Sequence, residues 1–114
     1  MIVVAEKDSL DQRIRDGLLL DNYGALLTGK QRMACAMILL QDLSLSEAAE
    51  TLGVSRQGVH DLITRAREHM EGYESSFGLI ARRQQTDKME QMLEENRERL
   101  PEDFYTTFKK ILEA

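Results

Sequence analysis

The sequence has almost no cysteine or proline and no tryptophan. Cys35 is the only cysteine in 114 residues, so neither an intramolecular disulfide nor a cysteine-based zinc site can form. Its neighbours, MACAMILL, are apolar and predict a small buried core residue. With one proline, Pro101, and few runs of β-branched residues, the chain favours helices over strands.

The sequence also lacks a long hydrophobic segment and an excess of positive charge. No segment approaches the roughly 20 apolar residues that cross a bilayer, and the N-terminal MIVVA is too short for a secretory signal. A soluble, cytoplasmic protein with no membrane partner is expected. The formal net charge is −5, whereas a sequence-independent binder of duplex DNA relies on a strong positive field. Nucleic-acid binding would therefore have to come from a local patch.

Apolar residues recur at helical spacing along the chain and predict an all-α helical bundle of five or six helices. The first helix is expected from Asp8 or Ser9 to about Tyr23. Its inward-facing residues are predicted to be Leu10, Ile14, Leu18 and Leu19. The second is expected to begin after Thr28, which can cap it while Gln31 reaches back to the cap.

We predict a single domain over residues 1–114, in three parts. Residues 1–27 form an N-terminal extension and helix, residues 28–71 a helix-turn-helix segment, and residues 72–114 a helical C-terminal extension. Within this extension we expect a charged helix over about 82–99 and a last helix over about 102–113. A domain of this size buries only part of its surface, so self-association would add burial and a homodimer is expected.

The segment from Ser44 to Arg67 has the pattern of a helix-turn-helix unit. Ser44 and Glu47 form a capping box for a short helix over 45–52, and Gly53 suits a left-handed turn. Ser55 can cap a second helix that is predicted to run to about Tyr73. The apolar residues of this second helix fall on one stripe: Val59, Leu62, Ile63, Ala66 and Met70.

The outward face of this second helix carries candidate nucleic-acid contacts. Arg56 and Gln57 lie at its N-terminal end, where base-reading residues usually lie, and they suit guanine and adenine edges. Asp61 lies on the same face and would meet phosphates or purine acceptors unless it reads a cytosine amino group, which argues against a DNA reader. The candidate nucleic-acid-binding residues are Ser55, Arg56, Gln57, His60, Thr64, Arg65, Lys30 and Arg32.

The C-terminal extension carries large apolar residues at helical spacing. They favour adaptable core packing, and the alternative is a groove for a partner or a second copy. The candidate contacts are Met89, Met92, Leu93, Phe104 and Phe108.

Other chemistry is not indicated. His60 and His69 are nine residues apart and lie on different sides of one helix, so no metal site is expected. A phosphate-binding loop of the GxxxxGK[ST] type is absent, and no catalytic constellation is present. We therefore expect neither enzymatic activity nor a cofactor.

Two family patterns match the chain. The segment from Ala25 to Glu71 resembles region 4 of bacterial sigma factors at Leu27, Gln31, Arg32, Ala49, Leu52, Gly53, Val54, Ser55, Arg65 and Ala66. A wider match, through LLLDNYGALLTGKQR, DLSLSEAAETLGVSRQGVHDLITRAREHMEGYE and the acidic helical tail, resembles the YlxM family. These are small bacterial helix-turn-helix proteins encoded beside Ffh, the GTPase of the signal recognition particle.

The resemblance to the YlxM family implies an accessory or regulatory role in the signal recognition particle pathway. Asp61 fits that family's pattern, and dimers are in keeping with it. The sequence is therefore compatible with two functions of different classes. One is a factor that binds the particle's protein or its RNA, and the other is a transcription regulator that reads a promoter element in DNA with the helix over 56–71.

Overall fold

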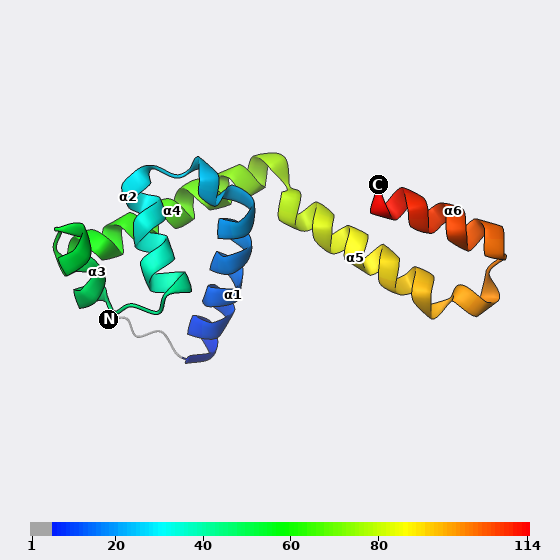
Figure 1. Cartoon of the computed structure of the whole chain (residues 1–114), viewed down its shortest axis with the longest axis horizontal. Helices are drawn as coiled ribbons and strands as arrows, with labels where there is room; N and C mark the ends of the chain where they lie inside the picture. Colours follow the sequence, from blue (N-terminus) through cyan, green and yellow to red (C-terminus); the bar gives the residue numbers. More distant parts are fainter. Residues whose placement is uncertain (1–5) are drawn as a thin grey trace. The chain divides into compact units, whose positions relative to one another are not determined.

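The computed structural model describes residues 6–114, with side chains from Leu10 onward, and this part of the chain is built of helices and short connections (Figure 1). The predicted all-α, helix-turn-helix fold is confirmed. The MIVVA segment and the proposed caps Asp8 and Ser9 lie outside the described side chains. The elements are α1 (Glu6–Tyr23), η1 (Gly24–Leu26), α2 (Gly29–Cys35), η2 (Ala36–Leu40), α3 (Leu45–Leu52), α4 (Arg56–Phe77), α5 (Leu79–Glu95), η3 (Arg97–Arg99) and α6 (Glu102–Glu113).

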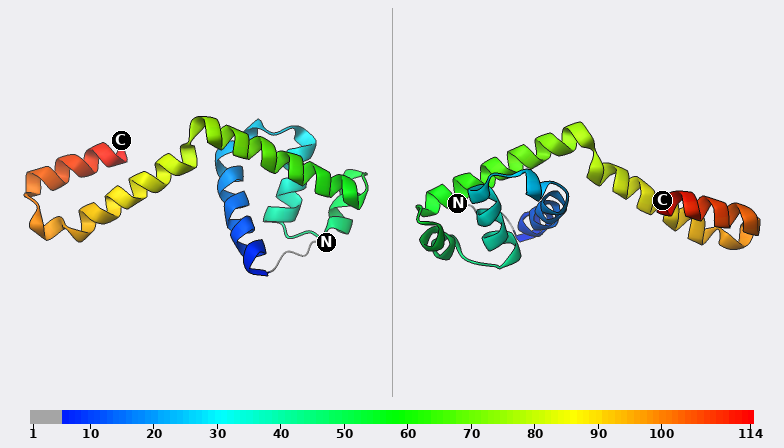
Figure 2. Two further views of the ribbon diagram at one scale, coloured as in Figure 1. Left: turned by 180° about the vertical axis from the view of Figure 1, so that it is seen from behind. Right: turned by 45° about the horizontal axis from the view of Figure 1, so that its top comes forward.

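The chain forms two compact units, Met1–Phe77 and Gly78–Ala114. The single-domain assignment over residues 1–114 stays a prediction. In the N-terminal unit α4 is central, because it contacts α1, α2 and α3 (Figure 2). Its buried side chains are those of the predicted stripe, with Leu62 half-buried: Val59, Ile63, Ala66 and Met70.

Local hydrogen bonds explain where the middle helices begin. The backbone N–H of Gln31 donates to Oγ1 of Thr28 at 3.3 Å, as predicted. The sequence also predicts the reciprocal bond, from the backbone N–H of Thr28 to the Gln31 side chain, and this prediction is wrong. That side chain is buried, and its Oε1 accepts no hydrogen bond. At α3 the full capping box is present, because Ser44 and Glu47 exchange bonds of 2.9 and 3.1 Å.

The inward face predicted for α1 is largely wrong. Leu10, Ile14 and Leu18 are exposed, with 60%, 58% and 36% of their surface accessible, and of the four predicted residues only Leu19 is fully buried. The helix also begins at Glu6, before the predicted start. Its buried face is centred on Leu19 and Tyr23 and includes a carboxylate, Asp16, which is fully buried.

Asp16 is buried because it forms an ion pair with α4. The guanidinium of Arg67 donates to both carboxylate oxygens, with N–O distances of 2.8, 3.0 and 3.1 Å. Gln12, one turn earlier on α1, donates to Asp16 at 2.8 Å. Burying a carboxylate is tolerated only when its oxygens are paired in this way. The ion pair therefore fixes the position of α1 on α4.

Helix α4 is longer than predicted and ends at Phe77 instead of Tyr73. Its last turns pack on the buried ring of Tyr23, whose centroid lies 6.0 Å from that of Tyr73 and 6.5 Å from that of Phe77. The Tyr23 hydroxyl donates to Glu74 at 2.5 Å. These contacts hold the helical conformation past Tyr73, the residue near which the sequence predicts the end of this helix.

The C-terminal unit is a helical hairpin of α5 and α6. The predicted helix over 82–99 is wrong in its bounds, because α5 spans Leu79–Glu95 and η3 follows it. The side chain of Asn96 donates to the backbone carbonyl of Met92 at 2.8 Å, and such side-chain bonds offer the backbone an alternative to helix continuation. Pro101 then precedes α6, which has the predicted bounds.

Cys35 is fully buried, as predicted, and burial raises the pKa of its thiol to about 11. We expect the thiol of the folded protein to react with a disulfide reagent at pH 8 at least about 100-fold more slowly than in the unfolded chain, because the reactive thiolate is scarce and inaccessible. Absorbance-monitored labelling in buffer and in urea measures the reactivity, and equal rates would contradict burial.

The raised pKa of the Cys35 thiol also affects stability. Its contribution to the free energy of unfolding is full below about pH 9 and is lost as the pH rises toward 11.

Candidate nucleic-acid and protein interfaces

The helix-turn-helix unit consists of α3, a tight turn and α4 (Figure 1). Gly53 ends α3 with φ of 69°, a conformation that glycine adopts without steric cost. Ser55 then caps α4, since the backbone N–H of Gly58 donates to its Oγ at 2.9 Å. The small residues Ala48 and Ala49 are buried where α3 packs against α4.

Six of the eight candidate nucleic-acid contacts lie on α4 or, in the case of Ser55, at its N-cap. Thr64 is half-buried, and the other five are exposed: Ser55, Arg56, Gln57, His60 and Arg65. These side chains are brought together because they are on one helix. Their use as contacts stays a prediction.

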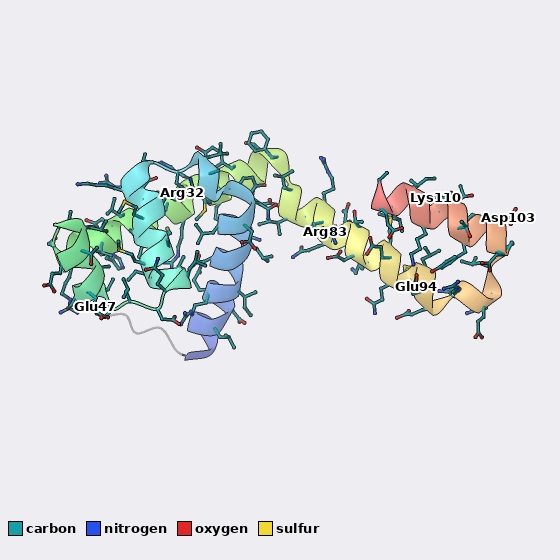
Figure 3. The ribbon with its side chains drawn as sticks, in the orientation of Figure 1. Arg32, Glu47, Arg83, Glu94, Asp103 and Lys110 are labelled. Carbon is teal, nitrogen blue, oxygen red and sulfur yellow. The ribbon has the colours of Figure 1, made fainter. Side chains whose placement is uncertain are left out.

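Lys30 and Arg32 are on a different helix, α2. Arg32 is labelled in Figure 3. Both are exposed. Arg32 lines a cavity of about 240 Å³ with Leu20 and Asp21 of α1, and residues of η1 and η2 complete the lining. The structure therefore groups Arg32 with the end of α1. A common surface of Lys30 and Arg32 with the N-terminus of α4 stays a prediction.

Asp61 interacts with two of the candidate nucleic-acid contacts on α4. Its carboxylate accepts a hydrogen bond of 3.0 Å from the side-chain amide of Gln57, one turn earlier. The His60 ring nitrogen Nδ1 lies 3.9 Å from the same carboxylate. The Gln57 amide must break its hydrogen bond to Asp61 before it can bond to the edge of an adenine. The i, i+4 spacing of Gln57 and Asp61 indicates this pair from sequence.

Further carboxylates lie on the exposed surface of the helix-turn-helix unit. Glu47 and Glu50 are exposed on α3, and Glu68 is exposed on α4. Hydrogen bonds from the backbone and side chain of Ser44 hold the pKa of Glu47 below its ordinary value, so this carboxylate is ionised at neutral pH. The surface around the candidate contacts is therefore of mixed charge.

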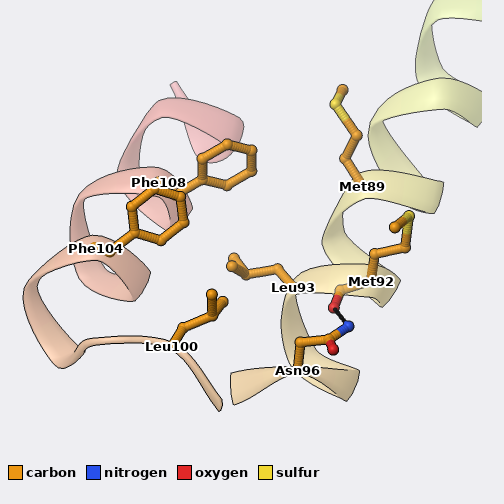
Figure 4. Close-up of a pocket in the computed structure, with 7 residues that line it drawn as sticks. All are labelled: Met89, Met92, Leu93, Asn96, Leu100, Phe104 and Phe108. Atoms are coloured by element: carbon orange, nitrogen blue, oxygen red, sulfur yellow. Dashed lines mark hydrogen bonds between the residues drawn. The ribbon is translucent and has the colours of Figure 1, made fainter. Parts of the chain in front are cut away.

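The candidate contacts of the C-terminal unit line one apolar cavity of about 300 Å³ between α5 and α6 (Figure 4). Asn96 and Leu100 complete it. Leu93 is buried at its floor, whereas Met92 and Phe104 are 63% and 50% exposed. The rings of Phe104 and Phe108 stack with centroids 5.7 Å apart. The structure brings all five predicted residues together: Met89, Met92, Leu93, Phe104 and Phe108.

The other side of the hairpin is polar, and this feature was missed in the sequence. Tyr105 is buried, and its hydroxyl donates to Glu94, to which Lys109 also donates at 3.3 Å. The guanidinium of Arg97 lies 4.3 Å from the centre of the Tyr105 ring. The hydrogen bond from Tyr105 lowers the pKa of Glu94. The hairpin therefore has one polar side that is satisfied internally and one apolar side that faces solvent.

Two kinds of site are not found in the described part of the chain. Its His, Cys, Asp and Glu side chains form no group of three or more that could hold a metal ion. None of its helices has the length and apolar character of a membrane span.

These features define a helix-turn-helix protein, with a capped second helix and an appended helical hairpin. Comparison with known families then places it. The model of the family UPF0122, helix-turn-helix protein, YlxM / p13 like, matches residues 10–111, and the chain belongs to this family.

Three relatives named UPF0122 proteins illustrate the similarity. The relative from Caldanaerobacter subterraneus is 46% identical over 78 residues, which is 68% of this chain and 67% of that protein. The relative from Clostridium botulinum is 37% identical over 107 residues, covering 91% of this chain and 98% of that protein. The relative from Halalkalibacterium halodurans is 41% identical over 86 residues, 75% and 79% of the two chains.

Proposed function

We propose that this protein is an accessory or regulatory factor of the signal recognition particle pathway, and that it acts in the cytoplasm by binding the particle's protein or its RNA. The pathway follows from the resemblance of the sequence to the YlxM family. One observation favours this role over DNA reading. Gln57 is hydrogen-bonded to Asp61 at 3.0 Å, in a protein of net charge −5. A recognition helix of this kind has little positive field to hold duplex DNA.

The apolar side of the hairpin supports protein binding. Exposed contiguous apolar surface with a polar rim is typical of protein contacts. We propose that the protein is a homodimer and that Met89, Met92, Leu93, Phe104 and Phe108 form a protein-binding surface. No catalytic role, cofactor or membrane partner is proposed.

One observation favours a transcription regulator as the second candidate. Ser55 caps α4, and Arg56 and Gln57 are exposed in its first turn, which is the position of base-reading side chains in helix-turn-helix proteins. Arg56 carries no carboxylate partner at i+4, where His60 stands. In this alternative, Arg56, Gln57 and His60 read a promoter element.

Titration against three partners separates the two functions. The protein is titrated against the particle's GTPase Ffh, the particle's RNA and random duplex DNA, each at two salt concentrations. Saturable binding to the GTPase or the RNA, with weak and salt-sensitive duplex binding, is expected. Failure to bind the particle, together with a duplex sequence selected from a random pool, would show a transcription regulator instead.

Substitution of the recognition helix gives a second test. We expect Arg56→Ala and Gln57→Ala to change the affinity for the GTPase by less than about twofold, since the proposed protein-binding surface lies on the hairpin. Arg83→Ala, an exposed arginine of α5, is the matched control. A loss of about 1–3 kcal/mol in duplex affinity with relaxed sequence preference, seen for the α4 variants and not for the control, would support the DNA reader.

A further inference from the structure

A cavity opens on the surface of the N-terminal unit where α1, η1, α2 and η2 meet. Its volume is about 240 Å³, and its apolar walls include Leu20 of α1 with Ala36 and Leu40 of η2. Leu40 is 67% exposed, so this wall is open to solvent. The volume is below the roughly 300–1,000 Å³ of sites for small-molecule ligands, and it suits an apolar side chain of a partner.

The apolar wall continues along the outward side of α2 and η2. Met33, Ala36 and Leu40 follow one another at intervals of three and four residues, which places them on one side of this helical segment. In the wider turn of the π-helix η2, residues four apart remain on the same side. Met33 is 49% exposed and Ala36 is half-buried. The segment therefore presents apolar side chains to solvent as well as to the core, where Ala34 and Cys35 lie.

Positive charge accompanies this surface, although the protein is acidic overall. From Asn22 to Gln41 the sequence contains no Asp or Glu, and its charged residues are Lys30 and Arg32. Both side chains are exposed, and Arg32 lies on the wall of the cavity. Within the part of the chain that the structure describes, neither of them forms an ion pair. Both cations are therefore available to a partner.

One carboxylate, that of Asp21 at the end of α1, also lines the cavity and reduces its positive charge. Asp21 is exposed and forms no ion pair with Arg32. Two cations against one carboxylate leave the surface positive. The charges therefore favour a partner that carries a carboxylate beside Arg32 and none beside Asp21.

We propose that this surface of α1, η1, α2 and η2 is a docking site for a partner protein, and that it takes a segment in which Asp or Glu stands next to an apolar residue. The apolar side chain enters the cavity between Leu20 and Leu40, and the carboxylate pairs with Arg32. An RNA would use the cations but would leave the cavity and the exposed side chains of Met33 and Leu40 without a contact. The inference goes beyond the proposed function, because it depends neither on the pathway nor on the homodimer.

Peptide selection on the full chain tests the docking site. A displayed library of short random peptides is first depleted on the Arg32→Glu variant, which keeps the apolar face of the hairpin, and is then selected on the wild-type protein. We expect enriched peptides that place Asp or Glu next to a large apolar residue. Enrichment of peptides rich in Lys or Arg, or of no peptide at all after the depletion, would overturn the proposal.

Substitutions then locate the binding of an enriched peptide, measured by fluorescence anisotropy. Arg32→Glu should weaken binding about tenfold and Leu40→Ala about fivefold, because the ion pair and the apolar wall are lost. Arg65→Glu, at an exposed arginine of α4, is the control for overall charge and should change the affinity less than about twofold. Equal losses for Arg32→Glu and Arg65→Glu would reflect net charge alone and would overturn the docking site.

Two further outcomes would assign the surface to a different occupant. Asp21→Asn should strengthen peptide binding about twofold, since it removes a carboxylate beside an acidic segment. A loss of affinity in this variant would show that Asp21 pairs with a cation of the partner, and the acidic segment would be wrong. If Lys30→Ala and Arg32→Ala weakened binding of the particle's RNA while Leu40→Ala affected neither the RNA nor a selected peptide, the surface would belong to the nucleic acid.

Discussion

Replacing Arg67 by methionine should lower the free energy of unfolding by about 3–5 kcal/mol, because it leaves the fully buried carboxylate of Asp16 without its cationic partner. Methionine keeps the apolar stem of the arginine, so the loss reports the ion pair more than the packing. Among the residues whose side chains are described, Gln12 is then the remaining hydrogen-bond partner of Asp16, and its neutral amide cannot balance the charge. Urea denaturation followed by circular dichroism measures the change.

A second ion pair between α1 and α4, that of Arg15 with Glu71, provides the control for this prediction. Arg15 pairs with Glu71 of α4 at 2.6 Å, but both side chains are partly exposed, 36% and 46%. Exposed pairs contribute little, so Arg15→Met should cost below about 1 kcal/mol. Equal losses for Arg67→Met and Arg15→Met would contradict the role given to burial. The double variant Asp16→Asn with Arg67→Met should recover part of the loss, because no charge is then left unpaired.

Truncation of Tyr23 to alanine should cost about 3–5 kcal/mol, the range found for buried aromatic side chains. The ring is 1% exposed and packs on Tyr73 and Phe77, so its removal leaves a cavity between α1 and the end of α4. Tyr23→Phe keeps the ring and removes the hydroxyl that donates to Glu74, and it should cost about 1 kcal/mol. Thermal and urea denaturation of the two variants separate the packing from the hydrogen bond.

Phe77 serves as the matched aromatic control. Its ring belongs to the same cluster but is 54% exposed, so Phe77→Ala should cost clearly less than Tyr23→Ala. If the two truncations cost the same, Tyr23 would not be the residue that holds the end of α4. Amide hydrogen exchange adds a local test, since residues after Gly72 should lose protection in Tyr23→Ala before the N-terminal turns of α4 do.

Much of the helix-turn-helix unit could be predicted because its signals are local. Ser44 with Glu47, Gly53 and Ser55 act through hydrogen bonds or dihedral angles within three or four residues, and the structure shows each of them in the predicted role. Pro101 marks the start of α6 for the same reason. The buried stripe of α4 also follows from the sequence. The apolar residues of this helix fall on one face, and the helix packs against three others.

The same reasoning from apolar periodicity predicts the wrong buried face for α1. Leu10, Ile14 and Leu18 form a regular apolar stripe, yet they are exposed, and the helix buries Asp16 with Leu19 and Tyr23. A regular stripe does not reveal whether another part of the chain is available to cover it. The burial of Asp16 depends on Arg67, which is 51 residues away in sequence. No local pattern connects the two.

For this protein, then, the sequence by itself determined the class of fold, the caps and turn of the helix-turn-helix unit, and the residues that would gather on the C-terminal hairpin. Short-range hydrogen bonds and helical spacing were sufficient for these features. Only the tertiary structure decided which face of α1 is buried, how far α4 extends, and that Asp16 is paired with Arg67. Each of these depends on which side chains meet in space, and the energy of a buried charge or ring is set by the partner it finds there.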